Sequence, residues 1–292
     1  MADGYAEPAS LDRLMAELRP RLHRYCARMV GSAVDGEDVV QEALAKAAAA
    51  YPTGGGVERP ENWLFRIAHN TALDALRLRK RQVPLAAFDL AGMADPAGAA
   101  DARVAATAGL AAFMHLPAAQ RSSVVLMDVL GYSLAETVEI LGVSLAAVKA
   151  ALHRARARLK TLAADPDDRP PRLAEAERDR LKAYADRFNA RDFDALRDLL
   201  AEDVRLDLVS RTKLAGRKDV SVYFSRYEGV SDWRFTAGMA DGRPALLGGD
   251  PADASGATRW VVFLDWTDGR IAAIRDFKYA PYVMESLSVR PL

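Results

Sequence analysis

The chain has 292 residues, half of them hydrophobic, and its 40 basic and 40 acidic side chains leave a formal net charge of zero. That length allows two or three domains, and the composition argues against three classes of protein. A membrane protein needs a long apolar run, a secreted protein starts with a basic and then an apolar segment, and a disulfide-stabilised protein needs more than the single Cys26. We therefore expect a cytoplasmic protein without a membrane partner.

Two helices are predicted at the start of the chain. Apolar residues at helical spacing predict the first over residues 11–30, and Asp35 is expected to cap a second, alanine-rich helix that ends near Tyr51. The second helix carries polar residues at Asp35, Asp38, Gln41 and Glu42. Acids in a first turn complement the helix dipole, but Gln41 and Glu42 lie beyond that turn. The same face therefore also fits a docking surface for a basic partner helix.

A loop rich in glycine and proline, YPTGGGVERPE (51–61), precedes a third helix that ends near Gln82. The loop lacks the lysine and the serine or threonine of a phosphate-binding loop. The helix carries polar, basic and aromatic residues that are candidates for nucleic-acid binding: Asn62, Trp63, His69, Asn70, Asp74 and Arg77. Basic residues beside exposed aromatic rings bind single strands, whereas a buried Trp63 would belong to the core. The sequence leaves both interpretations open.

Residues 133–160, SLAETVEILGVSLAAVKAALHRARARLK, predict two short helices joined by a tight turn. Ser133 and Glu136 form a capping-box pattern, Gly142 permits the turn, and Ser144 is expected to cap the second helix. The buried side of the second helix is expected to hold Leu145, Val148, Leu152, Ala155 and Leu159. Its remaining positions hold Lys149, His153, Arg154, Arg156, Arg158 and Lys160, with no acid among them. This pattern favours a helix-turn-helix that places its second helix in the DNA major groove over an ordinary helical hairpin with a solvated basic face.

These segments together resemble a known family. The resemblance is carried by DGEDVVQEAL, RPENWLFRIAHNTALDALR and the stretch from Leu116 to Lys160. These segments are similar to regions two and four of bacterial sigma factors, in the short form of the extracytoplasmic-function group. The resemblance covers residues 10–163, as region two (10–82) and region four (108–163). The segment between them, 83–107, has the composition of a linker, as does 164–173 with its prolines and acids.

The resemblance implies roles for particular residues. Asp35, Asp38, Gln41 and Glu42 match the surface that docks on core RNA polymerase. Residues that match the helix holding the melted minus-ten element are Asn62, Trp63, His69, Asn70, Asp74 and Arg77. Residues that match the start and the base-reading face of the minus-thirty-five recognition helix are Ser144, Lys149, His153, Arg154 and Arg156.

The remaining segment, 174–292, changes character from helices alone to helices followed by strands. Asp241-Gly242 and Asp268-Gly269 separate strand-like runs and indicate hairpins. The expected fold is thus two all-α domains followed by an α+β cone with a curved antiparallel sheet. This segment resembles the SnoaL-like, polyketide-cyclase-like members of the nuclear-transport-factor superfamily.

Relatives in that superfamily use a buried aspartate or histidine as a general base. All four histidines precede this segment, so a histidine base is excluded. The side chains expected near a pocket are Tyr184, Asp207, Trp233, Arg259, Arg275 and Asp276. Carboxylates on a half-exposed sheet are more often solvated or ion-paired than catalytic, and a one-residue register slip reverses which of them face inward.

The leading hypothesis is therefore a sigma factor that binds core polymerase and promoter DNA, with a C-terminal domain that regulates it in cis and takes a small-molecule or protein ligand. We expect no catalytic activity, cofactor or metal. One alternative is a DNA-associated cyclase or isomerase with a catalytic cone, and another is a repressor that acts without polymerase. The acidic helix argues against a repressor, which needs no polymerase-docking face.

Overall fold

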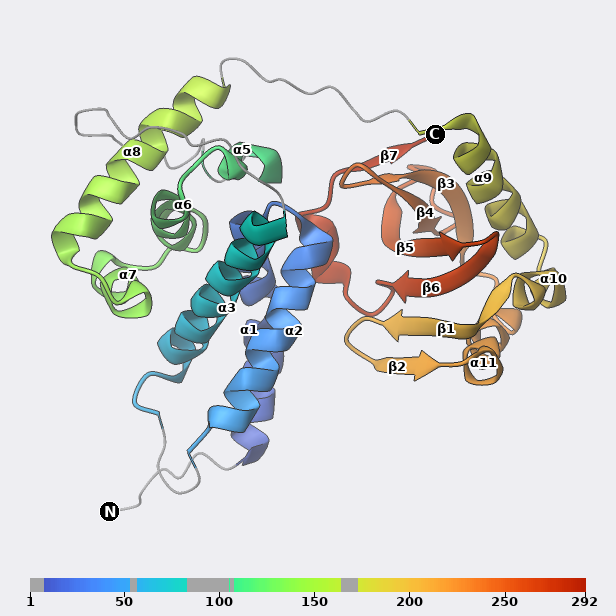
Figure 1. Ribbon diagram of the computed structural model, residues 1–292, viewed down its shortest axis with the longest axis horizontal. Helices are drawn as coiled ribbons and strands as arrows, with labels where there is room; N and C mark the ends of the chain where they lie inside the picture. The colour runs from blue at the N-terminus through green and yellow to red at the C-terminus, as the bar shows by residue number, and fades with distance from the viewer. Residues whose placement is uncertain (1–7, 53–56, 83–104, 106–107, 164–172) are drawn as a thin grey trace. The chain divides into compact units, whose positions relative to one another are not determined.

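The computed structural model describes residues 8–52, 57–82, 105, 108–163 and 173–292. They form two compact units, one on either side of a division near residue 167 (Figure 1). The glycine run at 53–56 lies outside the described residues. So do nearly all of the two predicted linkers, 83–107 and 164–173.

The N-terminal unit begins with three helices: α1 (Pro8–Val30), α2 (Ala33–Ala50) and α3 (Pro60–Gln82). The cap predicted for α2 was wrong by three residues. Ser32 is the N-cap, and its hydroxyl accepts the backbone N–H of Asp35 at 3.2 Å. Gly36 lets α1 and α2 approach closely, because a Cβ there would lie 2.6 Å from the backbone of Ala27.

The same unit continues with α5 (Leu110–Met114), α6 (Ala118–Val124), a π-helical turn (Val125–Val129), α7 (Leu134–Leu141) and α8 (Leu145–Ala163). The capping signals predicted for the hairpin are confirmed. Ser133 and Glu136 form the capping box, and Gly142 adopts a left-handed φ of 65°. The hydroxyl of Ser144 accepts the backbone N–H of Ala147 at 3.2 Å.

One hydrophobic core joins the helices of both predicted helical domains. It contains Leu22 and Phe65 from α1 and α3 as well as Val124 and Leu152 from α6 and α8. Arg121 of α6 is buried in this core and donates to the carbonyls of Met29 and, at 2.8 Å, Leu116. Desolvation lowers the pKa of Arg121 to about 10. The helix-turn-helix and the first three helices therefore pack together in this structure.

The C-terminal unit begins with α9 (Glu175–Asn189), α10 (Phe193–Asp198), β1 (Leu200–Leu208), β2 (Thr212–Ala215) and α11 (Arg217–Glu228). It continues with β3 (Arg234–Ala240), β4 (Arg243–Gly249), β5 (Thr258–Thr267), β6 (Arg270–Asp276), a 3₁₀ turn (Pro281–Glu285) and β7 (Val289–Pro291). The seven strands form a curved open sheet in the order β2-β1-β6-β5-β4-β3-β7 (Figure 1). The predicted α+β cone is confirmed, with one correction. The sheet is mixed rather than antiparallel, because β1 pairs in parallel with β6.

Both predicted hairpins are present. In the turn between β3 and β4, Asp241 and Gly242 have φ of 47° and 72°, and between β5 and β6, Asp268 and Gly269 have φ of 51° and 76°. Two successive positive φ values match the right-handed twist of the flanking strands, and aspartate followed by glycine tolerates them. These local signals specify the pairing of β3 with β4 and of β5 with β6.

Candidate functional site

The predicted polymerase-docking residues lie on α2 in two environments. Asp38 and Glu42 are exposed, and Glu42 forms a helical ion pair with Lys46 at 2.7 Å. Asp35 is half-buried and forms a salt bridge with Arg79 of α3. Gln41 is half-buried beside Glu37, which is itself buried in a salt bridge with Arg19. The outward acidic face is therefore made chiefly by Asp38 and Glu42.

The predicted minus-ten residues on α3 also separate into an exposed and a buried group. Asn70, Asp74 and Arg77 are exposed, and the Asp74 carboxylate accepts from Arg77 at 2.8 Å. Asn62 and His69 are buried. These residues therefore do not form one continuous surface in this structure.

His69 is a structural residue here. Its Nδ1 lies 2.7 Å from the hydroxyl of Tyr25 in the core. Burial, and then the nearby charge of Arg77, lowers the pKa of His69 to about 4. The imidazole is therefore neutral at neutral pH, and its role is to hold α3 against α1.

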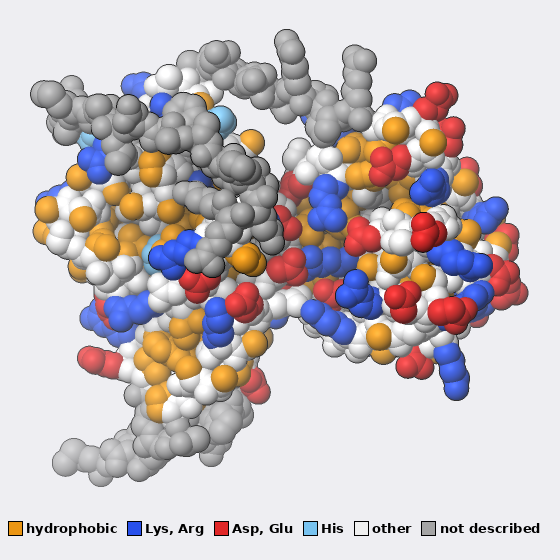
Figure 2. Space-filling model, in the orientation of Figure 1, with side chains coloured by type: hydrophobic (Ala, Val, Ile, Leu, Met, Phe, Trp, Pro, Cys, Tyr) orange, Lys and Arg blue, Asp and Glu red, His pale blue; other side chains and the backbone are white. Residues whose placement is uncertain are grey.

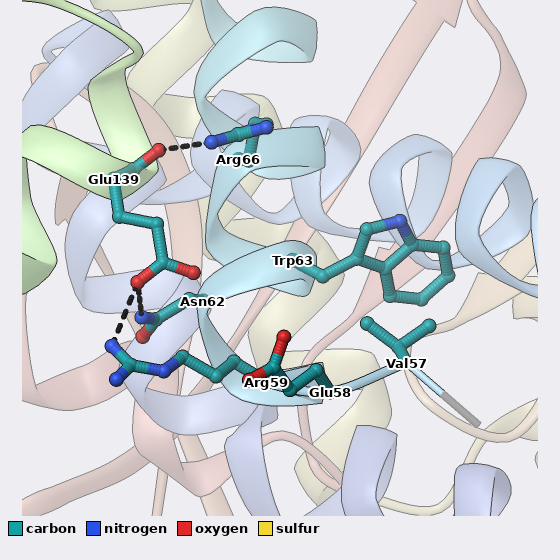
Figure 3. A pocket seen from close by; sticks show the side chains of 7 residues that line it. All are labelled: Val57, Glu58, Arg59, Asn62, Trp63, Arg66 and Glu139. Carbon is teal, nitrogen blue, oxygen red and sulfur yellow. Dashed lines mark hydrogen bonds and ion pairs between the residues drawn. The ribbon is translucent and has the colours of Figure 1, made fainter.

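A cleft of about 500 Å³ lies at the start of α3, where Asn62 contacts Glu139 of α7 and Trp63 points to the other side, near Val57 (Figure 3). The carboxylate of Glu139 accepts hydrogen bonds from Asn62 at 2.8 Å and from Arg59 at 2.9 Å. The guanidinium of Arg66 donates to the backbone carbonyl of Glu139. Trp63 is half-buried and packs edge-on against Tyr51, with ring centroids 6.0 Å apart. The cleft thus combines two guanidinium groups, an amide and an indole ring with the carboxylates of Glu58 and Glu139.

Sequence reasoning missed Arg59, Arg66 and Glu139. Arg59 and Glu139 are 80 positions apart, so helical spacing carries no signal for their contact. The basic character of the loop end at Arg59 was the one available indication.

Helix α8 has an exposed basic face, and one prediction for it, the burial of Leu145, was wrong. Ser144, Lys149 and Arg154 are exposed and His153 is half-buried. Arg156 points away from that face and forms a salt bridge with the buried Asp128. Leu145, predicted to be buried, is 49% exposed.

Asp276 is the centre of a polar cluster in the C-terminal core. Its side chain is fully buried. One carboxylate oxygen accepts from the hydroxyls of Tyr223 and Tyr227 at 2.9 and 2.8 Å, and the other accepts the backbone N–H of Lys278 at 2.8 Å. Desolvation raises the pKa of Asp276, and these hydrogen bonds oppose that rise. Burial, and then the charge of Asp276, raises the pKa of Tyr184 as well.

Besides Tyr184, the buried Trp233 also lies at this cluster, with its ring centroid 5.3 Å from that of Tyr227, but the other predicted pocket residues do not. Asp207 and Arg275 are register partners on β1 and β6, with 3.6 Å between a carboxylate oxygen and Nε. They alternate with core residues and so face the opposite side of the sheet. Arg259 is 53% exposed and pairs with Asp250 at 3.0 Å. The predicted set is therefore divided between the core and the outer face.

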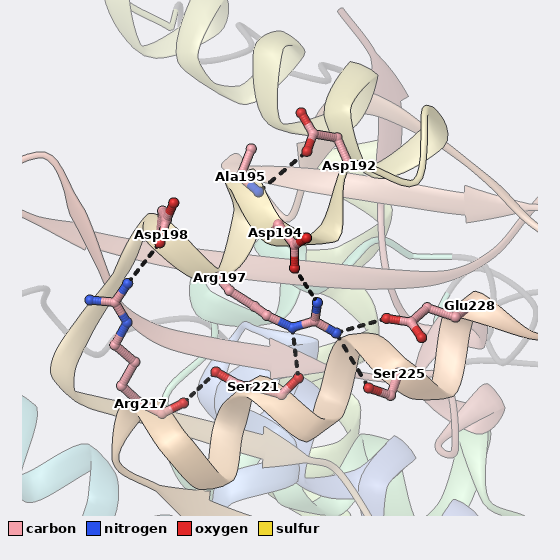
Figure 4. A network of polar contacts seen from close by, with 9 residues as sticks. All are labelled: Asp192, Asp194, Ala195, Arg197, Asp198, Arg217, Ser221, Ser225 and Glu228. Carbon is pink, nitrogen blue, oxygen red and sulfur yellow. Dashed lines mark hydrogen bonds and ion pairs between the residues drawn. The ribbon is translucent and has the colours of Figure 1, made fainter.

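A second polar cluster joins α10 to α11 on the surface of this unit (Figure 4). Arg197 contacts Asp194 and Glu228 at 2.8 and 2.7 Å, and Arg217 contacts Asp198 at 3.0 Å. A cleft of about 180 Å³ beside Arg197 is lined by Asp194 and Glu228 together with Arg191 and Phe193. The charges in this cluster pair with one another, and they hold the two helices together.

Two features are absent from the described part of the chain. Among those residues, no three His, Cys, Asp or Glu side chains are grouped as metal ligands. Nor does any helix there have the length and apolar character needed to cross a membrane.

Comparisons with known proteins match three parts of the chain. Residues 14–82 match the family model of sigma-70 region 2, residues 110–159 that of sigma-70 region 4, and residues 181–274 that of the SnoaL-like domain.

Two curated relatives are from Mycobacterium tuberculosis. The ECF RNA polymerase sigma factor SigG is 34% identical over 214 residues, which are 63% of this chain and 57% of SigG. The chain thus spans just over half the length of SigG. The ECF RNA polymerase sigma factor SigM is 33% identical over 156 residues, which are 52% of this chain and 76% of SigM. Among solved structures, the extracytoplasmic-function sigma factor SigJ of the same organism overlaps 91% of this chain and 95% of its own, with 21% identity and a TM-score of 0.35.

Proposed function

The chain belongs to the extracytoplasmic-function sigma factors of bacterial RNA polymerase, and from this premise we propose that it directs core polymerase to a set of promoters. The observation that carries the proposal is a pairing of opposite charges. The outward face of α2 is acidic at Asp38 and Glu42, and the outward face of α8 is basic at Lys149 and Arg154. One polypeptide thus has a surface for a basic protein partner and a surface for DNA.

Core polymerase is the proposed partner of α2. Exposed carboxylates steer and orient a basic partner surface, and Asp38 and Glu42 are the two that extend outward. Asp35 and Gln41 lie at the edge of this face. Asp35 pairs with Arg79. For Asp35 to contribute to docking, its carboxylate must bind Arg79 and the partner at once, or the ion pair must open.

The proposed ligand of α3 is the unpaired strand of the minus-ten element. Asn70, Asp74 and Arg77 supply exposed polar groups, and Trp63 supplies a ring beside the cleft on which a base can stack. Arg59 and Arg66 add positive charge for phosphates. His69 is assigned a supporting role, because its imidazole is buried against Tyr25.

The proposed ligand of α8 is the duplex of the minus-thirty-five element. Lys149 and Arg154 are available for phosphates and base edges, with Ser144 and His153 beside them. Arg156 is left out of this set because its guanidinium is bound to Asp128. Leu145 and Val143 are 49% and 45% exposed at the start of α8, where the residues of a recognition helix approach base edges. We assign them apolar contact with thymine methyl groups.

The C-terminal unit is proposed to regulate the sigma portion in cis. On the face drawn in Figure 2, its Lys and Arg side chains are interspersed with Asp and Glu, which does not favour DNA binding by this unit. Regulation requires a ligand or partner that binds one state of the protein better than the other. A small molecule or a protein bound by this unit would supply that difference.

A catalytic cone is the second candidate, and Asp276 is the residue that would serve as its base. Both of its carboxylate oxygens already accept hydrogen bonds, which favours a structural role. Turnover of a polyketide-like or steroid-like substrate that is lost in Asp276→Asn would support catalysis instead.

Reconstitution with core polymerase tests the main proposal. The full chain should form a holoenzyme and start RNA synthesis from specific genomic fragments, and core polymerase alone should not. Failure to form a holoenzyme, or a holoenzyme that starts no RNA at any promoter, would refute it. Comparison with a chain that ends at Leu162 tests regulation, because identical transcription over a range of concentrations would remove the regulatory role.

A further inference from the structure

The position of Glu139 links the helix-turn-helix to the face of α3 that the proposed function assigns to the unpaired strand. Glu139 lies on α7, and its carboxylate oxygen accepts from both Arg59 and Asn62. Figure 3 shows the Glu139 side chain directed at these two groups, with Arg66 bound to its backbone carbonyl. An acidic residue from region four thus binds three donors of region two.

These donors have the chemistry of a nucleic-acid site. Guanidinium and amide groups bind phosphate oxygens, and the half-buried ring of Trp63 borders the same cleft. A carboxylate is an anionic acceptor, as a phosphate is, so Glu139 satisfies the groups that a phosphate would satisfy. With α7 in place, Asn62 is only 7% exposed and is closed to other ligands.

Neighbouring contacts hold α7 in this position. The hydroxyl of Tyr132, just before α7, donates to Glu61 at 2.5 Å, and Glu61 also binds Arg21. Ile140 of α7 is buried in the shared core. Because α7 leads through Gly142 into α8, moving α7 off α3 also moves the recognition helix.

We infer that Glu139 occupies a phosphate site of region two, so that the helix-turn-helix and the unpaired promoter strand compete for Arg59, Asn62 and Arg66. This inference rests on the proposed function and adds a regulatory contact to it. The Glu139 ion pair is partly exposed, with 59% of the Arg59 side chain and 36% of the Glu139 side chain accessible, so it is a weak contact. A strand that brings several phosphates can therefore displace it, whereas a single anion cannot.

The test measures binding of the full chain, without polymerase, to a fluorescein-labelled single-stranded oligonucleotide that carries the minus-ten element of a mapped promoter. Glu139→Gln removes the charge of the competitor and should raise the affinity roughly 3- to 5-fold, the upper part of the range expected for loss of one weak ion pair from the closed state. Glu17→Gln is the matched control. Glu17 is exposed on α1, where it pairs with Arg13 at 2.8 Å, and it does not line the cleft. This variant therefore makes the same change of charge away from the site, and its affinity should stay within about twofold of the wild type.

A second measurement follows α7 directly. Hydrogen exchange of the peptide that contains residues 134–141 should quicken when the oligonucleotide binds the wild type. Equal affinities for the wild type and Glu139→Gln would overturn the inference, as would strand binding without faster exchange in α7. In either case, a holoenzyme that still transcribes would leave the proposed function intact. If no variant binds the strand and no holoenzyme forms, both are wrong.

Discussion

Arg156 and Asp128 form a salt bridge with two hydrogen bonds, in which Nε donates to Oδ2 at 2.8 Å and Nη2 donates to Oδ1 at 2.6 Å. The side chains are 19% and 3% exposed. The pair fixes α8 to the π-helical turn Val125–Val129 that follows α6. Arg156 therefore positions α8, while other basic side chains of this helix, such as Lys149 and Arg154, are exposed.

Arg156→Ala is expected to destabilise the N-terminal unit by roughly 3–5 kcal/mol, because it leaves the buried carboxylate of Asp128 without its partner. Arg158→Ala is the control, since Arg158 is exposed on the same helix and its loss should change stability by less than about 0.5 kcal/mol. Urea unfolding followed by circular dichroism measures both.

An Arg156→Ala variant that keeps its stability but loses affinity for minus-thirty-five duplex would instead return Arg156 to the residues proposed to contact DNA. A double-mutant cycle with Asp128→Ala separates the two outcomes, because only the salt bridge predicts coupling between the two positions.

Features specified by neighbouring residues were the ones that could be predicted. The capping box at Ser133 and Glu136 and the two aspartate–glycine hairpins depend on residues within four positions of each other. The cap of α2 failed for a local reason, since Ser32 and Asp35 are both good caps and the sequence does not choose between them.

Features that depend on distant residues could not be predicted. Leu145 fits an apolar helical stripe, but the described elements of the chain leave it 49% exposed. The contact of Glu139 with Arg59 and that of Asp276 with Tyr223 join positions 80 and 53 residues apart. The parallel pairing of β1 with β6 also joins residues far apart in the sequence. The alternation of side chains along each strand places Asp276 in the core and Asp207 on the opposite face of the sheet.

Protonation of His69 should make the N-terminal unit sensitive to acid. The pKa of His69 is lowered from 6.5 to about 4 in the folded chain, so the unfolded chain binds a proton first as the pH falls. Stability is therefore complete above pH 6.5 and is lost as the pH falls toward 4. Between pH 7 and pH 5 the loss from this residue should be about 2 kcal/mol.

Glu and Asp side chains also titrate in acid, so the effect of His69 is measured as a difference between variants. His69→Gln should show a fall in unfolding free energy from pH 7 to pH 5 that is smaller than that of the wild type by this amount. His115→Gln, at an exposed position, should behave as the wild type does. Identical pH profiles for all three chains would show that His69 does not carry the dependence.

Charge reversal on α2 should remove polymerase binding. Asp38→Arg combined with Glu42→Arg replaces two exposed carboxylates with like charges facing a basic partner, and the affinity for core polymerase should fall by at least about tenfold. Biolayer interferometry with immobilised core polymerase measures it. Glu17→Arg reverses a charge at an exposed position of α1 and should leave the affinity nearly unchanged.

Binding of minus-thirty-five duplex should be the same for these variants as for the wild type, because α8 is untouched. A double variant that binds polymerase normally would place the docking surface elsewhere on the chain.

Thymine methyl groups provide the sharpest test of Leu145. If its exposed side chain packs on a thymine in the major groove, replacing that thymine with deoxyuridine removes one methyl group and should weaken duplex binding about fourfold, the value of one buried methyl. Leu145→Ala should weaken binding by a similar factor and should no longer respond to the same deoxyuridine. Lys149→Ala is the contrasting control: loss of a phosphate contact weakens binding to every sequence and lowers the salt dependence, but the response to deoxyuridine stays. A wild-type chain that is indifferent to deoxyuridine at every thymine of the element would rule out this contact, since no other base presents a methyl group in the groove.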